Sequence, residues 1–85
     1  MVNIYLLIEL LGAANAGDVT AALKEVELSN CKLVNVVELS DDKLVGQLDC
    51  DSYADASKAV LDKIAPVEGI VQTNIMAAVR PVKRG

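Results

Sequence analysis

Apolar and polar residues follow the spacing of strands along four stretches of the chain. From Asn3 to Leu10 and from Ile70 to Val79 they alternate with a period of two, which is typical of β-strands. Cys31 to Leu39 is rich in Val and Leu, as in a mostly covered strand. The polar cluster from Ser40 to Lys43 separates it from a further apolar run, Leu44 to Cys50. This arrangement predicts that the second and third strands form an antiparallel hairpin.

Between these strands the apolar spacing changes to three or four residues, which predicts two helices. Asn15 is a suitable N-cap for the first helix, which should end near Leu28. Its apolar stripe consists of Val19, Ala22, Leu23 and Val26. Asp51-Ser52 can cap the second helix, and Pro66 and Gly69 should end it. The apolar residues of this second helix are Tyr53, Ala56, Val60, Ile64 and Val67.

The predicted succession is β-α-β-β-α-β over one domain, residues 1–85, which is the order of the ferredoxin-like α+β fold. Its right-handed crossovers place both helices on one face of a four-stranded antiparallel sheet. We expect the other face to carry the function, because nothing in the chain is left to cover it.

Two sets of side chains compete for that second face on the first strand: Ile4, Leu6, Ile8 and Leu10, or Tyr5, Leu7 and Glu9. On the last strand we expect Gln72, Asn74, Met76 and Ala78 there, with Val34, Val36 and Val45 available nearby. A contiguous apolar patch in a soluble protein usually marks an interface. We therefore predict a homodimer whose interface includes Tyr5, Leu7, Glu9, Gln72 and Met76.

Composition supports association and argues against several kinds of chemistry. Of the 85 residues, 53% are apolar and only two are aromatic, so the core should be aliphatic. The core of so short a domain contributes little stability by itself, and its high apolar content therefore suggests a partner. The net charge of −4 does not suit nucleic acid or an anionic membrane. Histidine is absent, and no phosphate loop or calcium loop is present. We predict no enzymatic activity, no catalytic residues, no metal and no cofactor.

The N-terminal apolar run has no basic residues before it, and Glu9 interrupts it, so we expect neither a signal peptide nor a membrane span. This favours the cytoplasm, where Cys31 and Cys50 should be free thiols. Their distance depends on the hairpin register. With Asp41 and Asp42 at the turn, Cys50 faces Leu33; with a turn one residue earlier, the two thiols face each other.

The strand Ile4 to Ile8 and the segment Lys63 to Met76, with its step Val67-Glu68-Gly69-Ile70, resemble the effector-binding (RAM) domain of the Lrp/AsnC family. The resemblance implies a dimeric α/β barrel with a role in transcription regulation, formed by sheet-to-sheet dimerisation and often followed by ring-like assembly. It also implies that a small, amino-acid-like effector is held between subunits. Since the first strand starts beside Met1, we expect no DNA-binding helix-turn-helix.

The same resemblance suggests ligand-binding residues. The family's turn between the second and third strands commonly reads Gly-x-Tyr-Asp, and this chain has another sequence there. The candidate residues are Ser40, Asp41, Asp42, Lys43, Thr73 and Asn74.

Two other functions are compatible with the same fold. One is a signal-peptide-binding assembly chaperone of the NapD type, which also has a Val-Glu-Gly step before its last strand and whose open sheet would take a basic peptide. The other is a small monooxygenase or isomerase, which the lack of histidine and the scarcity of aromatic residues make the weakest alternative.

Overall fold

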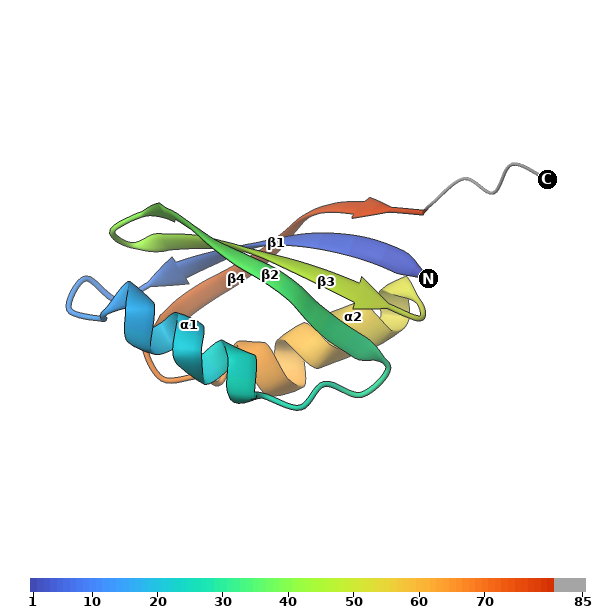
Figure 1. Ribbon diagram of the computed structural model, residues 1–85, viewed down its shortest axis with the longest axis horizontal. Helices are drawn as coiled ribbons and strands as arrows, with labels where there is room; N and C mark the ends of the chain where they lie inside the picture. Colours follow the sequence, from blue (N-terminus) through green and yellow to red (C-terminus); the bar gives the residue numbers. More distant parts are fainter. Residues whose placement is uncertain (81–85) are drawn as a thin grey trace.

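A computed structural model describes residues 1–80 of the chain. The elements follow the predicted succession of strands and helices (Figure 1). In chain order they are β1 (Val2–Leu10), α1 (Ala16–Glu25), β2 (Cys31–Ser40), β3 (Lys43–Cys50), α2 (Tyr53–Ala59), the π-helical stretch η1 (Val60–Ile64) and β4 (Ile70–Val79).

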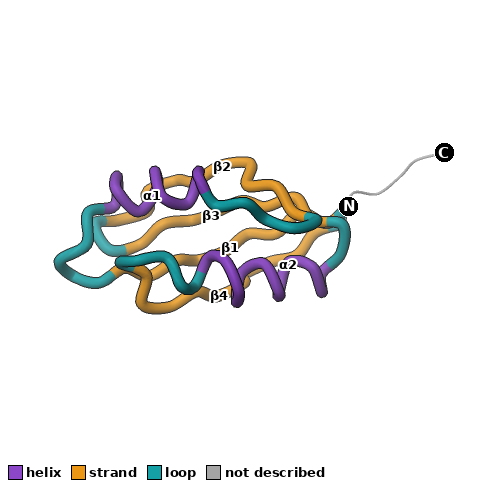
Figure 2. Tube along the Cα trace, turned by 90° about the horizontal axis from the view of Figure 1, so that it is seen from below, coloured by secondary structure: helices purple, strands orange, loops and turns teal. Residues whose placement is uncertain are grey.

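The strands form one four-stranded antiparallel sheet in the order β2-β3-β1-β4. Both helices lie on the same side of this sheet, α1 along the β2–β3 half and α2 along the β1–β4 half (Figure 2). The protein is therefore an α+β fold in two layers, and no element of residues 1–80 lies on the other face of the sheet. Within residues 1–80, no helix is long and apolar enough to cross a membrane.

The core lies between the sheet and the two helices, and it is aliphatic as predicted. Every second residue of β1 is buried there, with Ile4 and Leu6 fully inaccessible. Leu44 and Leu48 of β3 are also inaccessible, and Leu23 of α1, at 3% exposure, belongs to the same core cluster. Burying a side chain of this size contributes about 1.5–3 kcal/mol. These residues settle the choice between the two faces of β1: Ile4, Leu6, Ile8 and Leu10 face the helices.

Both predicted helix N-caps are confirmed, and of the pair Asp51-Ser52 it is Ser52 that caps α2. The side chain of Asn15 accepts a hydrogen bond from the backbone N–H of Asp18 at 3.1 Å, and that of Ser52 accepts one from Asp55 at 3.1 Å. The end of α1 was predicted too late, because its last residue is Glu25 and the backbone is already extended at the next position. A cap satisfies backbone donors that the first turn leaves free, which explains why starts were easier to predict than ends.

The turn into β4 depends on Gly69, whose φ of +95° is unfavourable for other residues. A Cβ at this position would lie 3.0 Å from Val19 and 3.3 Å from Ala14. The backbone of Gly69 thus approaches α1 and the preceding loop closely, and its carbonyl accepts a hydrogen bond from Leu11 at 2.9 Å. Gly69 is required here both for conformation and for space.

The two edge strands contain register shifts that the alternation pattern did not predict. Four residues are skipped in the pairing, two in β2 and two in β4. All four are large, apolar and about half or more exposed: Val34 47%, Leu39 62%, Val71 60% and Met76 51%. A shift of this kind adds one residue to a strand without adding a partner, so the strand bends and its later residues change partners.

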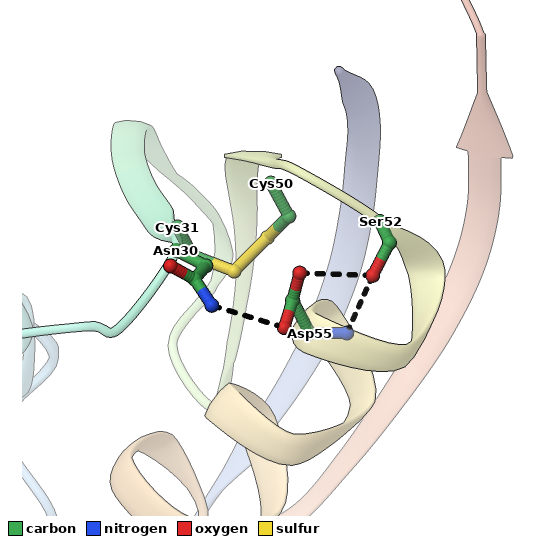
Figure 3. The surroundings of a disulfide bond; sticks show 5 residues. All are labelled: Asn30, Cys31, Cys50, Ser52 and Asp55. Atoms are coloured by element: carbon green, nitrogen blue, oxygen red, sulfur yellow. Dashed lines mark hydrogen bonds between the residues drawn. A yellow bond between two sulfur atoms is a disulfide. The ribbon is translucent and has the colours of Figure 1, made fainter.

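Cys31 and Cys50 form a disulfide (Figure 3), so the prediction of free thiols was wrong. The register shifts in β2 are the reason. The turn between β2 and β3 is centred on Asp41 and Asp42, which in a regular hairpin would pair Cys50 with Leu33. The two extra residues of β2 move the register by two positions, and Cys31 then lies opposite Cys50. The bridge ties the edge strand to its neighbour beside the N-terminus of α2.

Polar contacts next to the bridge hold the same corner of the fold. Asn30, in a left-handed conformation with φ of 60°, donates from its side chain to Asp55 at 3.2 Å. Asp55 also accepts a hydrogen bond from the hydroxyl of Ser52 at 2.9 Å. The loop before β2, the end of β3 and the first turn of α2 are therefore linked (Figure 3).

Candidate functional site: the uncovered face of the sheet

The sheet face opposite the helices, called the uncovered face below, is lined by alternate residues of all four strands. The β1 residues on this face are Asn3, Tyr5, Leu7 and Glu9, and all of them are half-buried within the single chain. Because directly paired residues of neighbouring strands point to the same face, the register gives the other positions. From β2 through β3 and β1 to β4, the rows are Lys32, Asp49, Asn3 and Val79; Asn35, Gln47, Tyr5 and Ala77; Val37, Val45, Leu7 and Asn74; and Ser40, Lys43, Glu9 and Gln72.

The chemistry of this surface changes along the strands. Its most apolar row contains Val37, Val45 and Leu7 side by side across three strands. The two end rows carry charges of opposite sign on neighbouring strands, Lys43 beside Glu9 at one end and Lys32 beside Asp49 at the other. An apolar centre with a charged rim is the usual composition of a protein–protein interface.

Four of the five predicted interface residues, Tyr5, Leu7, Glu9 and Gln72, lie on the uncovered face. The fifth, Met76, lies at the register shift of β4, and 51% of its surface is exposed. Beyond that shift the two sides of β4 exchange. Ala78 pairs with the buried Ile4, so its expected place on the uncovered face was wrong, and Ala77 and Val79 take that place.

Residues of β3 complete the surface, and the prediction included only one of them. Val45 is on the uncovered face as expected, and Lys43 and Gln47 lie in the rows on either side of it. Val36 pairs with Gly46 and packs against the core, so it belongs to the helix-covered side. Alternation within β3 could have identified Lys43 and Gln47, but only the pairing with β1 assigns the side.

The turn between β2 and β3 contains four of the predicted ligand-binding residues and is exposed. The hydroxyl of Ser40 donates to a carboxylate oxygen of Asp42 at 2.9 Å, and the Lys43 ammonium lies 3.6 Å from the same oxygen. The Ser40 hydrogen bond, followed by the Lys43 charge, lowers the pKa of Asp42 below its ordinary value. The turn therefore presents an ionised carboxylate and an ammonium side by side, with Asp41 exposed next to them.

The other two predicted ligand-binding residues do not share a face. Asn74 pairs with Leu7 on the uncovered face, whereas Thr73 pairs with the buried Ile8 and points toward the helices. Both line a shallow groove of about 400 Å³ between α2, η1 and β4, together with Tyr53 and Leu61. Since β1 lies between β3 and β4, a single chain does not bring Asn74 to the β2–β3 turn.

A second depression, of about 460 Å³, lies where the β1–α1 loop and the start of α1 meet the turn before β4. Its lining is mostly small and apolar, and its ionisable groups are the carboxyls of Asp18 and Glu68. The side chain of Asn15 in this lining already serves as the N-cap of α1. Across residues 1–80 no group of three or more metal-binding side chains comes together.

Comparisons with protein-family models, with curated proteins and with solved structures find no match for this chain.

Proposed function

We propose that this protein is a ferredoxin-like domain that associates with copies of itself through the uncovered face and binds a small, amino-acid-like effector between them. The observation that carries the proposal is the apolar row Val37, Val45 and Leu7, which crosses the centre of an otherwise polar surface. In this proposal the domain is of the Lrp/AsnC effector-binding type. Its role is regulatory.

The strand order supports the ferredoxin-like assignment. In a split β-α-β arrangement the first and third strands are central and the second and fourth are edges. The order β2-β3-β1-β4 has this distribution, and both helices lie on one side. Sheet-to-sheet dimerisation of such domains gives the dimeric α/β barrel that the sequence resemblance implies.

The shape of the edge strands favours association through the face instead of the edges. Each edge strand carries two register shifts, and shifts of this kind bend a strand and disrupt the ladder that a further strand would join. The two edges are therefore poorly suited to extending the sheet, and the uncovered face is the larger regular surface.

The β2–β3 turn supports the class of effector. A free amino acid carries an ammonium and a carboxylate, and the turn offers the Asp42 carboxylate beside the Lys43 ammonium. Charge-assisted hydrogen bonds to both groups of a zwitterion are about twice as strong as neutral ones. The exposed hydroxyl of Ser40, whose proton is donated to Asp42, can accept a further hydrogen bond.

Light scattering over a range of protein concentrations tests the association, and thermal denaturation with a panel of amino acids tests the effector. We expect a dimer or a larger closed oligomer at micromolar concentration, and an increase in melting temperature with at least one amino acid. A monomer at every concentration contradicts the proposal as a whole. An oligomer that no amino acid stabilises contradicts the effector alone.

A chaperone that binds a basic signal peptide on the uncovered face is the second candidate. The net charge of −4 and the exposed acids of the β2–β3 turn favour it. Titration with a twin-arginine peptide separates the two functions: saturable binding that dissociates the oligomer supports the chaperone, and no binding supports the effector domain.

A further inference from the structure

We propose that the two copies in the dimer are related by a two-fold axis parallel to the strands, located over the line between β1 and β3. In this arrangement Glu9 of each copy faces Lys43 of the other copy. The inference rests on the proposed association through the uncovered face, and it specifies which residues meet there.

The pairing of the central strands leads to this axis. Glu9 is paired with Lys43, and Leu7 with Val45, so each pair lies at one height along the sheet. A two-fold axis along the strands exchanges β1 with β3 and keeps that height. It therefore places Glu9 over Lys43 of the second copy, and Leu7 over Val45 of the second copy, and each contact occurs twice.

The distances between packed sheets suit these contacts. Sheets pack face to face about 10 Å apart, with their strands within about 30° of each other. Glutamate and lysine have long, flexible side chains that can reach across such a gap from the rim. The aliphatic Leu7 and Val45 fill the drier centre, where polar groups without partners would destabilise the interface.

The other simple arrangement has its axis perpendicular to the strands, and it matches the surface less well. It turns each strand end for end, so that Val45 faces Gln47 and Val37 faces Asn35 of the second copy. These contacts set both central valines against amide side chains, whereas the axis along the strands does so only for Val37, which faces Asn74 of the second copy. Its one favourable charge contact joins Lys43 to Asp49 of the second copy, which makes the two axes distinguishable by experiment.

The axis along the strands also brings Asn74 of one copy close to the β2–β3 turn of the other, whereas Thr73 stays on the helix-covered side. This axis exchanges β2 with β4, so Ser40 of one copy faces Gln72 of the other, and Asn74 lies in the adjacent row. The β2–β3 turn of one copy then adjoins β4 of its partner. The β2–β3 turn of one copy and Asn74 of the other would then line opposite sides of a ligand site between the copies.

The interface is small by the standard of stable dimers. Strands lie about 4.8 Å apart and rise about 3.3 Å per residue, so four strands of eight paired positions occupy about 500 Å² per copy, or about 1,000 Å² in total. Specific interfaces begin at about 1,000 Å². We therefore expect a dimer that dissociates measurably on dilution, and two charge contacts are then large enough to change its affinity.

Exchange of charges between separate chains tests the axis. The variants Glu9→Lys and Lys43→Glu each place like charges across the interface twice, and each should dimerise about tenfold more weakly than the wild type. A mixture of the two variants restores both opposite-charge contacts between chains, while within each chain the neighbouring charges stay alike. We expect the mixed dimer to return to within about threefold of wild-type affinity.

The matched control is the pair at the other end of the surface. Lys32→Glu mixed with Asp49→Lys should show a weaker preference for mixed dimers than the Glu9 and Lys43 variants, because the axis places Lys32 and Asp49 opposite the uncharged Val79 and Asn3 of the second copy, so that opposite charges meet only diagonally. Native mass spectrometry of the mixtures gives the dimer populations, and circular dichroism checks that each variant is folded.

Each outcome has one meaning. A mixture of Glu9→Lys with Lys43→Glu that stays as weak as its components overturns the axis. Recovery of affinity in a mixture of Lys43→Glu with Asp49→Lys supports the perpendicular arrangement and therefore also overturns the axis along the strands. A wild-type protein that is always monomeric removes the proposed function itself, which is a different result from either of these.

Discussion

Removing the Cys31–Cys50 bridge is expected to lower the free energy of unfolding by about 3 kcal/mol. The bridge joins residues 19 positions apart, and closing a loop of about that length in the unfolded chain accounts for about 3 kcal/mol in the chain-entropy description. For a domain of this size, such a change lowers the melting temperature by about 10–25 °C. Native proteins have free energies of unfolding of about 5–15 kcal/mol, so the bridge accounts for a large share of the stability of this small domain.

The variants Cys31→Ala, Cys50→Ala and the double variant separate the bridge from the packing of the side chains. Each single substitution already removes the bridge, so the double variant should be only slightly less stable than either single one. Since Cys50 is buried at 1% exposure and Cys31 is half-buried, Cys50→Ala should be the more destabilising single change by a few tenths of a kcal/mol to about 1 kcal/mol.

Denaturant unfolding with and without a reducing agent measures these differences. Without reductant we expect the wild type to be about 3 kcal/mol more stable than the variants, and with reductant to fall to their level. Alkylation of the unreduced, unfolded wild type should label neither cysteine. The reasoning is refuted if both cysteines are labelled, or if the two single substitutions have small effects that add in the double variant.

Three further changes test local features of the fold. Gly69→Ala should destabilise the protein by about 1–3 kcal/mol because of its positive φ and the close contacts of a Cβ, whereas Gly12→Ala, with open space around it, should have little effect in the same thermal denaturation. Ser52→Ala removes the N-cap of α2 and should cost about 1 kcal/mol by denaturant unfolding, and an unchanged stability would contradict the role of the cap. Ser40→Ala should raise the pKa of Asp42 toward its ordinary value of 3.8 in an NMR titration, because the hydroxyl that favours the ionised carboxylate is lost. A lowered pKa makes the folded state more stable above the unfolded-state pKa, and this contribution disappears as the pH falls through the folded-state pKa, so the pH dependence near that range should weaken in Ser40→Ala.

The sequence by itself determined the elements of this protein and their caps. Alternation, helical spacing and polar breaks depend on neighbours within the same segment, so they are visible in one chain. The N-caps at Asn15 and at Asp51-Ser52, the polar break from Ser40 to Lys43 and the aliphatic core follow from such local rules, whereas only the pairing centres the turn on Asp41 and Asp42. The side of β1 that faces the helices needed the tertiary structure, although its two alternative sets of residues were clear.

The tertiary structure decided every feature that depends on the pairing register of two neighbouring strands. The skipped residues Val34 and Leu39 lie in an apolar run that reads as regular strand, and only pairing with β3 reveals that they have no partner. Two such residues suffice to turn a predicted pair of free thiols into a disulfide. The shift at Met76 likewise moves Ala78 to the covered side of β4.

The same limit applies to the candidate site. The family resemblance grouped Thr73 and Asn74 as ligand-binding residues, but adjacent residues of a strand point to opposite faces. It could not place Lys43 beside Glu9, because that neighbourhood exists only once β1 and β3 have paired. Strand register is a property of two segments in contact, which is why the sequence predicted the strands and the folded sheet decided their surface.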